Sequence, residues 1–339
     1  MDAAFVEEQP PANPVVHHRR AMDVRVTQHT SVDPFRPEAV SDDTRAVNAR
    51  VVAKLAATPR PADLAANRAA FAAGLTAIPA SPRSPRARTL TISGPDGDVP
   101  LRIVAPDVVR GVYLHLHGGV WILGTNDMWD DQFERLGRDV GLACVSVDYR
   151  LAPEHVFPAA VDDSVAAARW LIGHAEREFS TSVLAIGGES AGAHLAVATL
   201  LRLRDEGRAG AFAAANLLYG CYDLSLTPSA RRATATPVLN RTSYEAGVAA
   251  FRGDVDPTDP ALSPLYADLA GLPQALFSVG TLDPLLDDSL FMHMRWRAAG
   301  GKSELAVYPG GLHGFDTFGG SLAKEASRAV SNFLSTAIG

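Results

Sequence analysis

A serine lies between two glycines in a segment that could make it a nucleophile. The run Gly188-Glu189-Ser190-Ala191-Gly192 follows the apolar stretch Val183–Ile186 and precedes the helical stretch Ala193–Ala198. A serine on a sharp strand-to-helix turn needs small residues two positions away on each side, because larger side chains would collide there. The start of the helix also directs its positive end toward an anion. This pattern predicts that Ser190 is a catalytic nucleophile.

A glycine-rich turn upstream of Ser190 could stabilise a negatively charged intermediate. The run His117-Gly118-Gly119-Val120-Trp121 follows the apolar stretch Val112–Leu116. Backbone N–H groups in such a turn can point at an oxyanion. Taken alone, its glycines could instead serve a tight turn that requires positive φ. The position of the turn, one strand–helix–strand unit before Ser190, favours an oxyanion hole.

A nucleophilic serine requires a general base and a carboxylate that orients the base. After a serine turn of this kind the expected order is Ser, Asp or Glu, His. Among the downstream histidines, His194 lies one helical turn beyond Ser190 and His293 lies within a predicted helix. Both are expected to have packing or surface roles. His313 follows the last predicted strand in a glycine-rich loop and is the predicted base.

Three aspartates compete for the role of the orienting carboxylate. Asp283 follows the predicted strand Ala275–Val279, at the carboxyl end where ligand-facing groups of open α/β sheets gather. Asp287 and Asp288 occupy the predicted first turn of a helix, where the helix dipole favours carboxylates for structural reasons. Asp283 is therefore the preferred candidate.

The segment Asp148–Ala160 is a second unusual run of charged, aromatic and proline residues. It reads as the end of a strand, a proline-ordered turn and the start of a helix. Arg150 and Glu154 are able to fix this loop by ion pairing. A structural role is expected for the segment.

Composition excludes several functional classes. The chain of 339 residues has a formal net charge of −7, so it lacks electrostatic support for a nucleic-acid or anionic-membrane partner. Cys144 and Cys221 lie in separate apolar stretches and predict neither a disulfide nor a zinc site. The first residues carry no apolar signal sequence and no stretch is long enough to span a membrane, so a cytoplasmic location is expected.

The positions of the predicted strands and helices indicate the fold class. Strands alternating with helices predict a mostly parallel sheet with helices on both faces, and Gly94-Pro95-Asp96-Gly97 predicts an initial hairpin. The predicted strands are Thr89–Ser93, Pro100–Val104, Val112–Leu116, Cys144–Val147, Val183–Ile186, Asn216–Tyr219, Ala275–Val279 and Leu305–Tyr308. The main predicted helices are Ala159–Glu178, Ala191–Glu206, Asp287–Ala299 and Leu322–Ala337.

Two regions lie outside this alternation. Residues 1–40 read as a loosely ordered arm, and Val40–Leu75 as one or two helices interrupted by Pro59 and Pro61. Between Cys221 and Pro273 the chain is rich in prolines and polar turns and has no clear strand. An insertion of that length is more typical of a lid than of a connector.

Together these motifs resemble the hormone-sensitive lipase family of bacterial carboxylesterases, from about Pro100 to the C-terminus. The matching segments are His117-Gly118-Gly119, Tyr149–Glu154 with Phe157-Pro158-Ala159, Gly188–Gly192, Asp283-Pro284-Leu285 and His313-Gly314-Phe315. The resemblance implies an eight-stranded α/β-hydrolase fold with a helical lid. It assigns residues 1–85 to the arm and lid helices, 222–265 to the lid insertion, and 86–221 with 266–339 to the catalytic core.

The resemblance also implies an activity: cofactor-free hydrolysis of short- to medium-chain acyl esters by a monomer or homodimer. The oxyanion donors implied are the N–H groups of Gly119, Val120 and Ala191, with Gly118 in the same loop. Where many members have a third glycine, this chain has Val120. An amidase such as an arylformamidase remains an alternative. A non-catalytic receptor of the same fold is disfavoured by the presence of His313.

Overall fold

The sheet begins with the hairpin that the turn Gly94–Gly97 predicts. The structure is a computed structural model that describes residues 33–58, 61 and 63–339. Strand β1 (Arg88–Gly94) pairs antiparallel with β2 (Gly97–Val104), and Gly97 has a φ of 127°, which favours glycine. β2 in turn pairs antiparallel with β4 (Leu142–Val147).

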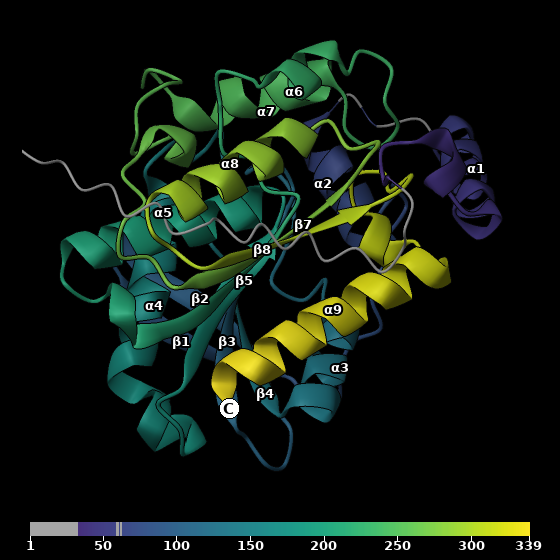
Figure 1. Cartoon of the computed structure of the whole chain (residues 1–339). Helices are drawn as coiled ribbons and strands as arrows, with labels where there is room; N and C mark the ends of the chain where they lie inside the picture. The colour runs from purple at the N-terminus through teal and green to yellow at the C-terminus, as the bar shows by residue number, and fades with distance from the viewer. Residues whose placement is uncertain (1–32, 59–60, 62) are drawn as a thin grey trace, which may run out of the picture.

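The remaining strands make the rest of the sheet parallel. They are β3 (Gly111–Leu116), β5 (Leu184–Glu189), β6 (Phe212–Leu218), β7 (Gln274–Gly280) and β8 (Ser303–Tyr308). The eight strands have the order β1-β2-β4-β3-β5-β6-β7-β8 (Figure 1). Because β3, β4 and β5 are buried along their whole length, they appear in the sequence as continuous apolar runs. The predicted mostly parallel, eight-stranded α/β-hydrolase sheet is confirmed.

Helices cover both faces of the sheet and divide the core into two layers. Helices α3 (Asp130–Val140) and α9 (Gly320–Ile338) pack on one face. Helices α4 (Ala159–Phe179), α5 (Ala191–Asp205) and α8 (Leu286–Ala298) pack on the other. Helix α3 is not among the main predicted helices, although its buried side chains Phe133, Leu136 and Val140 follow helical spacing.

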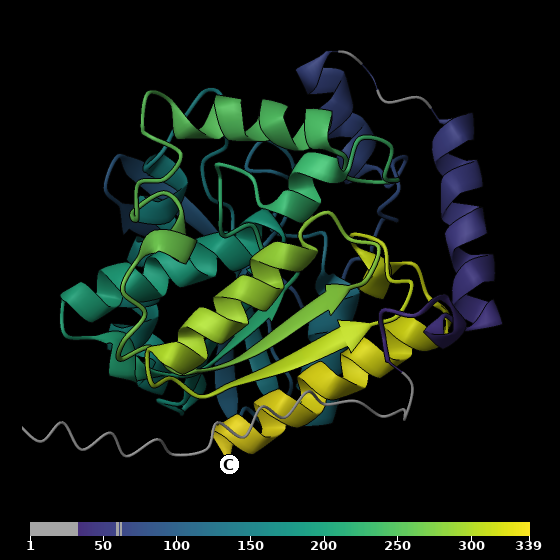
Figure 2. The same cartoon turned by 45° about the horizontal axis from the view of Figure 1, so that its top comes forward.

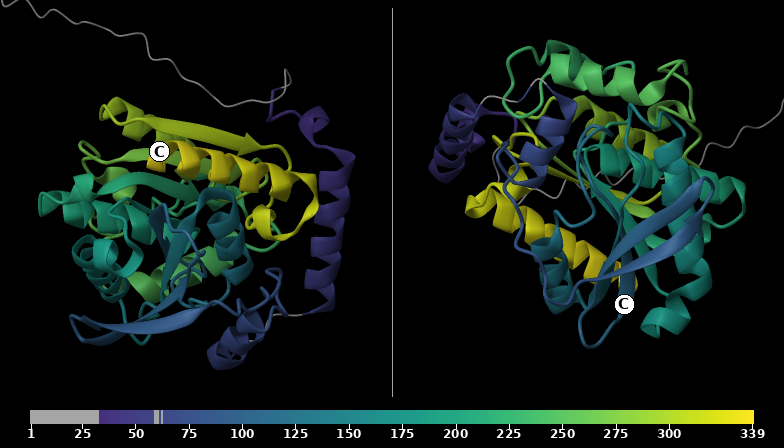
Figure 3. Two further views of the ribbon diagram at one scale, coloured as in Figure 1. Left: turned by 90° about the horizontal axis from the view of Figure 1, so that it is seen from below. Right: turned by 180° about the vertical axis from the view of Figure 1, so that it is seen from behind.

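A third group of helices lies outside these two layers. α6 (Pro228–Arg232) and α7 (Arg241–Arg252) belong to the insertion after β6 and lie above α5 and α8 (Figure 2). α1 (Asp42–Ala57) and α2 (Leu64–Ala72) come from the N-terminal segment, and α1 packs against α9 (Figure 3). Residues 1–32 of the expected arm lie outside the described residues. None of the helices in the described part is long and apolar enough to cross a membrane.

Candidate active site

Ser190 lies on the sharp turn between β5 and α5. Its φ of 56° and ψ of −121° are strained for a residue with a Cβ. A Cβ added at Gly188 or at Gly192 would collide with the backbone carbonyl of Leu116 at the end of β3. The two glycines therefore let the turn pack directly against β3. This agrees with the expectation from the sequence that larger side chains would collide at these two positions.

His313 lies within hydrogen-bonding distance of both Ser190 and Asp283. Its Nε2 is 3.0 Å from Ser190 Oγ, and its Nδ1 is 3.0 and 2.9 Å from the two carboxylate oxygens of Asp283. Since Nδ1–H donates to the carboxylate, Nε2 is left to accept the hydroxyl proton of Ser190. Ser190 is 5% exposed, Asp283 4% and His313 7%, so the three groups are largely shielded from water.

The two competing aspartates, Asp287 and Asp288, bond to the insertion after β6 and make no hydrogen bond with His313. Asp287 accepts a hydrogen bond from the backbone N–H of Ser229 at 2.8 Å. Asp288 accepts from the backbone N–H groups of Tyr222 and Asp223 and from the hydroxyl of Thr227. Asp288 is fully buried, and burial raises its pKa to about 7. At the start of α8, Asp287 and Asp288 thus serve to bind residues 222–229 of the insertion.

The glycine-rich loop after β3 places backbone N–H groups beside Ser190. Among the described residues, the N–H groups of Gly119, Val120 and Ala191 have no acceptor. Ala191 is the first residue of α5, where the amide lacks an intrahelical partner. The N–H of Gly118, in contrast, donates to Glu189 Oε1 at 2.8 Å. The N–H of Gly118 is thus already paired, and Gly118 anchors the loop to Glu189.

Val120 and Trp121 adopt backbone conformations that non-glycine residues rarely use. Their φ angles are 46° and 60°, and such strain is found where the surrounding structure enforces it. Trp121 is fully buried and stacks on Phe251 of α7 at 4.6 Å between ring centroids. Its Nε1–H donates to His194 Nδ1 at 3.1 Å, and His194 Nε2–H donates to the carbonyl of Leu262 at 2.7 Å. The insertion after β6 thus holds the loop in place.

Glu189 connects the serine turn to the glycine-rich loop. One carboxylate oxygen accepts the N–H of Gly118, and the other lies 2.9 Å from His115 Nε2. Burial raises the pKa of Glu189 well above its ordinary value. From the sequence alone, Glu189 is only one residue of the serine motif. The signal that could have indicated a buried partner is a charged residue among small ones at the end of a buried strand.

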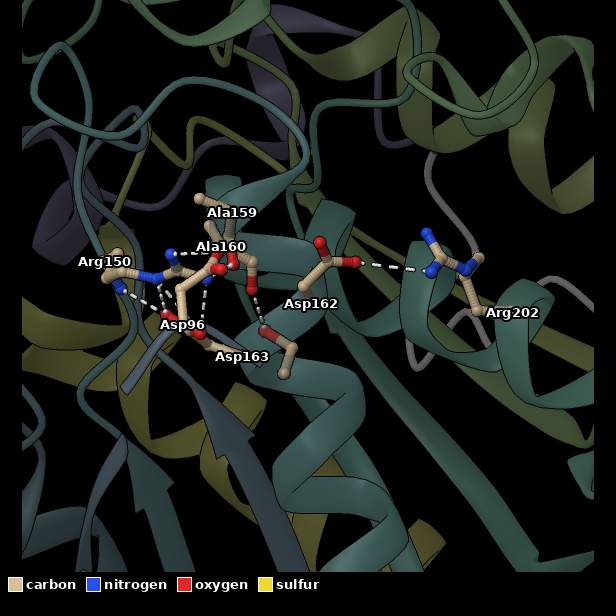
Figure 4. A network of polar contacts seen from close by, with 8 residues as sticks. Asp96, Arg150, Ala159, Ala160, Asp162, Asp163 and Arg202 are labelled. Atoms are coloured by element: carbon tan, nitrogen blue, oxygen red, sulfur yellow. Dashed lines mark hydrogen bonds and ion pairs between the residues drawn. The ribbon is translucent and has the colours of Figure 1, made fainter. Parts of the chain in front are cut away.

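Two residues of the segment after β4 support the site through ion pairs. Arg150 pairs with Asp163 of α4 and with Asp96 of the β1–β2 turn, both at 2.9 Å (Figure 4). Glu154 pairs instead with Arg68 of α2 at 2.7 Å. Both residues therefore form ion pairs, as the sequence suggests, but with partners that are remote in the chain.

Arg68 joins α2 to two loops of the core. Beyond its two hydrogen bonds with Glu154, it donates to the carbonyl oxygens of Ile122 and Ala152, each at 2.8 Å. Ile122 follows the strained pair Val120-Trp121. A planar guanidinium can satisfy all these acceptors at once, whereas an ammonium cannot. Arg68 therefore fixes the position of α2 relative to the glycine-rich loop.

We expect Arg68→Ala to raise KM severalfold and to lower kcat less. The substitution removes the contacts that position α2 but leaves Ser190, His313 and Asp283 intact. Steady-state kinetics on an activated ester would measure both constants. Arg68→Lys serves as the matched variant, and it should recover little of the loss because it cannot form the forked contacts. An unchanged KM in Arg68→Ala would contradict the role given to this residue.

A cavity of about 90 Å³ opens beside these groups. Its wall combines the core with both outer segments: Gly119, Val120, Ser190 and His313 from the core, Asn67 and Phe71 from α2, and Val238, Leu239 and Ser243 from the insertion. Tyr219 also lines it, and the Tyr219 hydroxyl donates to Asp316 at 2.6 Å. Over the described ranges, no group of three or more His, Cys, Asp or Glu residues is arranged to hold a metal ion.

The chain is similar to characterised esterases in sequence and in structure. It is 36% identical over 235 residues to an acetyl esterase of Salmonella typhi, which covers 67% of this chain and 72% of that protein. It is 34% identical over 264 residues to a carboxylic ester hydrolase of Mycobacterium tuberculosis. That match covers 75% of this chain and 70% of that protein. The crystal structure of an esterase from the bacterial hormone-sensitive lipase family matches with a TM-score of 0.74 and 32% identity, over 88% of this chain and 99% of that chain.

A protein family described as having the alpha/beta hydrolase fold matches residues 113–317. The matched range includes the glycine-rich loop, the serine turn, Asp283 and His313. Since this range is more than half of the chain, and the similar proteins cover two thirds of it or more, the family is established. The chain belongs to the α/β-hydrolase family, in the group of esterases that resemble hormone-sensitive lipase.

Proposed function

We propose that the protein is a serine carboxylesterase that hydrolyses short- to medium-chain acyl esters. The observation that carries this proposal is the chain of contacts from Ser190 through His313 to Asp283 beside the cavity. The names of the similar proteins support ester hydrolysis as the reaction class. The assignment makes Ser190 the nucleophile, His313 the general base and Asp283 the group that orients His313.

The reaction then proceeds through an acyl-enzyme. Ser190 Oγ attacks the ester carbonyl carbon while its proton passes to His313 Nε2. The N–H groups of Gly119, Val120 and Ala191 stabilise the resulting oxyanion. As the intermediate collapses, the C–O bond to the alcohol breaks and the alcohol takes the proton from His313. Water activated by His313 attacks the acyl-enzyme, which releases the acid and restores Ser190.

The division into a core and a lid is part of the same proposal. We assign residues 86–221 and 266–339 to the core, and 1–85 with 222–265 to the covering segments. The support is that α2 and the stretch 238–243 both contribute to the cavity wall. Substrate selection would therefore depend on segments that carry none of the proposed catalytic groups.

The size of the cavity supports a preference for short acyl chains. Its volume of about 90 Å³ is small compared with the roughly 300–1,000 Å³ of sites that enclose drug-sized ligands. The test is hydrolysis of a series of p-nitrophenyl esters from acetate to laurate, with Ser190→Ala as the blank. We expect kcat/KM to be highest at two to about six acyl carbons, because longer chains exceed the enclosed space. A maximum at laurate would contradict the chain-length proposal.

Val120 should narrow the part of the site that receives the alcohol. Its side chain contributes to the cavity wall and lies against α7, since a Cβ added at Gly247 would come within 2.8 Å of Val120 Cβ. We expect Val120→Gly to raise the ratio of kcat/KM for a tert-butyl ester over the matching ethyl ester, by about tenfold. The φ of 46° at this position suits glycine, so the loop conformation should be retained.

The two ratios can be measured by following acid release from tert-butyl and ethyl butyrate. Val120→Ala, which keeps the Cβ, should give a ratio between those of the wild type and Val120→Gly. An unchanged ratio in Val120→Gly would mean that this side chain does not limit the space for the alcohol.

A further inference from the structure

Two side-chain oxygens in the cavity wall, one of Asn67 and one of Thr76, are buried without hydrogen-bond partners. Asn67 on α2 is 9% exposed, and its Oδ1 has no partner. Thr76, four residues beyond the end of α2, also lines the cavity with an unpartnered buried Oγ1. Leaving a buried polar atom unpaired is unfavourable, so such atoms require an explanation.

The other hydroxyl and carboxyl groups that line this cavity are already hydrogen-bonded. Tyr219 donates to Asp316, Ser243 Oγ takes part in the cap of α7, and Thr317 donates to the carbonyl of Gly314. Glu189 and Ser190 have the partners described above. Within the described part of the chain, Asn67 Oδ1 and Thr76 Oγ1 are thus the buried side-chain oxygens of this wall that have no hydrogen-bond partner.

The position of Asn67 on its helix is also unusual. Asn67 and Phe71 are four residues apart, lie on the same face of α2 and are the two buried residues of this helix. That face would ordinarily carry apolar side chains. The neighbouring Arg68 holds α2 against Ile122, Ala152 and Glu154. These contacts of Arg68 hold the α2 segment that carries Asn67 at the cavity wall.

We propose that Asn67 and Thr76 form a polar subsite that binds a hydroxyl group on the ester substrate. A hydroxyl both donates and accepts, so it can pair with the amide of Asn67 and with the hydroxyl of Thr76. The substrate class is thereby an ester that carries a hydroxyl on its acyl chain or on its alcohol. The inference rests on the proposed esterase function and deepens it.

The experiment compares esters in which a hydroxyl replaces a methyl group of similar size. In the acyl arm, p-nitrophenyl 3-hydroxybutyrate is paired with p-nitrophenyl 3-methylbutyrate. In the alcohol arm, 2-hydroxyethyl butyrate is paired with propyl butyrate. Values of kcat/KM are measured for wild type, Asn67→Leu and Thr76→Val. Both substitutions keep the approximate size of the side chain and remove its hydrogen-bonding group.

In one of the two arms, we expect Asn67→Leu to lower the hydroxyl-to-methyl ratio of kcat/KM by about five- to tenfold. Thr76→Val should lower the same ratio by a smaller factor. The hydroxyl-to-methyl ratio is the quantity compared, because a general effect of either substitution on the site changes the rates on both esters alike. The arm that responds identifies which part of the substrate carries the hydroxyl.

Thr199→Val is the matched control. Thr199 Oγ1 is also buried without a partner, but Thr199 lies within α5 and does not line the cavity. Its substitution should leave the ratio unchanged. Thermal unfolding separates misfolding from loss of recognition, since Asn67→Leu removes an unpaired buried group and should melt at or above the wild-type Tm.

An unchanged ratio in both arms, in an Asn67→Leu variant that melts normally, would overturn the subsite while leaving the esterase assignment intact. If Thr199→Val lowered the hydroxyl-to-methyl ratio as much as Asn67→Leu does, the subsite would likewise be overturned. If the wild-type protein turned over none of the four esters, the esterase assignment and the subsite would both be overturned.

Discussion

Replacing Ser190 with alanine should remove nearly all ester hydrolysis, and replacing His313 with alanine should have a similar effect. The serine and the histidine act as a unit, because neither proton transfer nor nucleophilic attack occurs without the other. In serine proteases, loss of either residue lowers kcat by about 10⁶. The measurement is kcat on an activated short-chain ester, with thermal unfolding as the check that each variant is folded.

A buried thiol near Ser190 provides the control for this pair. Cys221 Sγ lies 4.0 Å from Ser190 Oγ, and burial raises the pKa of Cys221 well above its ordinary value. A protonated thiol is a poor nucleophile, so Cys221→Ala should keep most of the wild-type activity. If a folded Ser190→Ala or His313→Ala variant kept more than a few per cent of wild-type turnover, the assignment of these residues would be wrong.

Asp283→Asn should lower kcat by about 10⁴ while leaving the fold intact. The carboxylate of Asp283 accepts the Nδ1 hydrogen of His313 with both oxygens at 2.9–3.0 Å. An amide at this position can donate to Nδ1 and so stabilises the tautomer whose Nε2 carries the hydrogen, which cannot take the proton of Ser190. The corresponding change in a serine protease has this magnitude. Because the defect lies in the tautomer, it should appear in kcat more than in KM.

Asp287→Asn and Asp288→Asn are the matched variants for this prediction. Their carboxylates bond to residues 222–229 of the lid insertion. We expect these substitutions to change thermal stability or KM more than kcat. If either variant lost kcat to the extent expected of Asp283→Asn while Asp283→Asn remained active, the choice of carboxylate would be wrong.

The residues of the candidate site were predictable because each belongs to a short local pattern. Ser190, His117–Val120, Asp283 and His313 all follow apolar runs that form parallel strands. In such a sheet the carboxyl ends of the strands meet at one edge, so residues distant in sequence come together there. The order of the motifs along the chain therefore indicated which side chains would meet, and the contacts between Ser190, His313 and Asp283 agree with that order.

Local patterns in the sequence predict the class of fold and the residues expected at the edge of the sheet, because periodicity and turn residues act locally. The partners of Arg150 and Glu154, which are Asp163, Asp96 and Arg68, become visible in the folded chain alone. The same holds for the bond from the Gly118 N–H to Glu189 and for the position of Asn67 in the cavity wall. Such contacts depend on how α2 and the insertion pack on the core, and nothing in the spacing of one segment encodes the side chains that a remote segment presents.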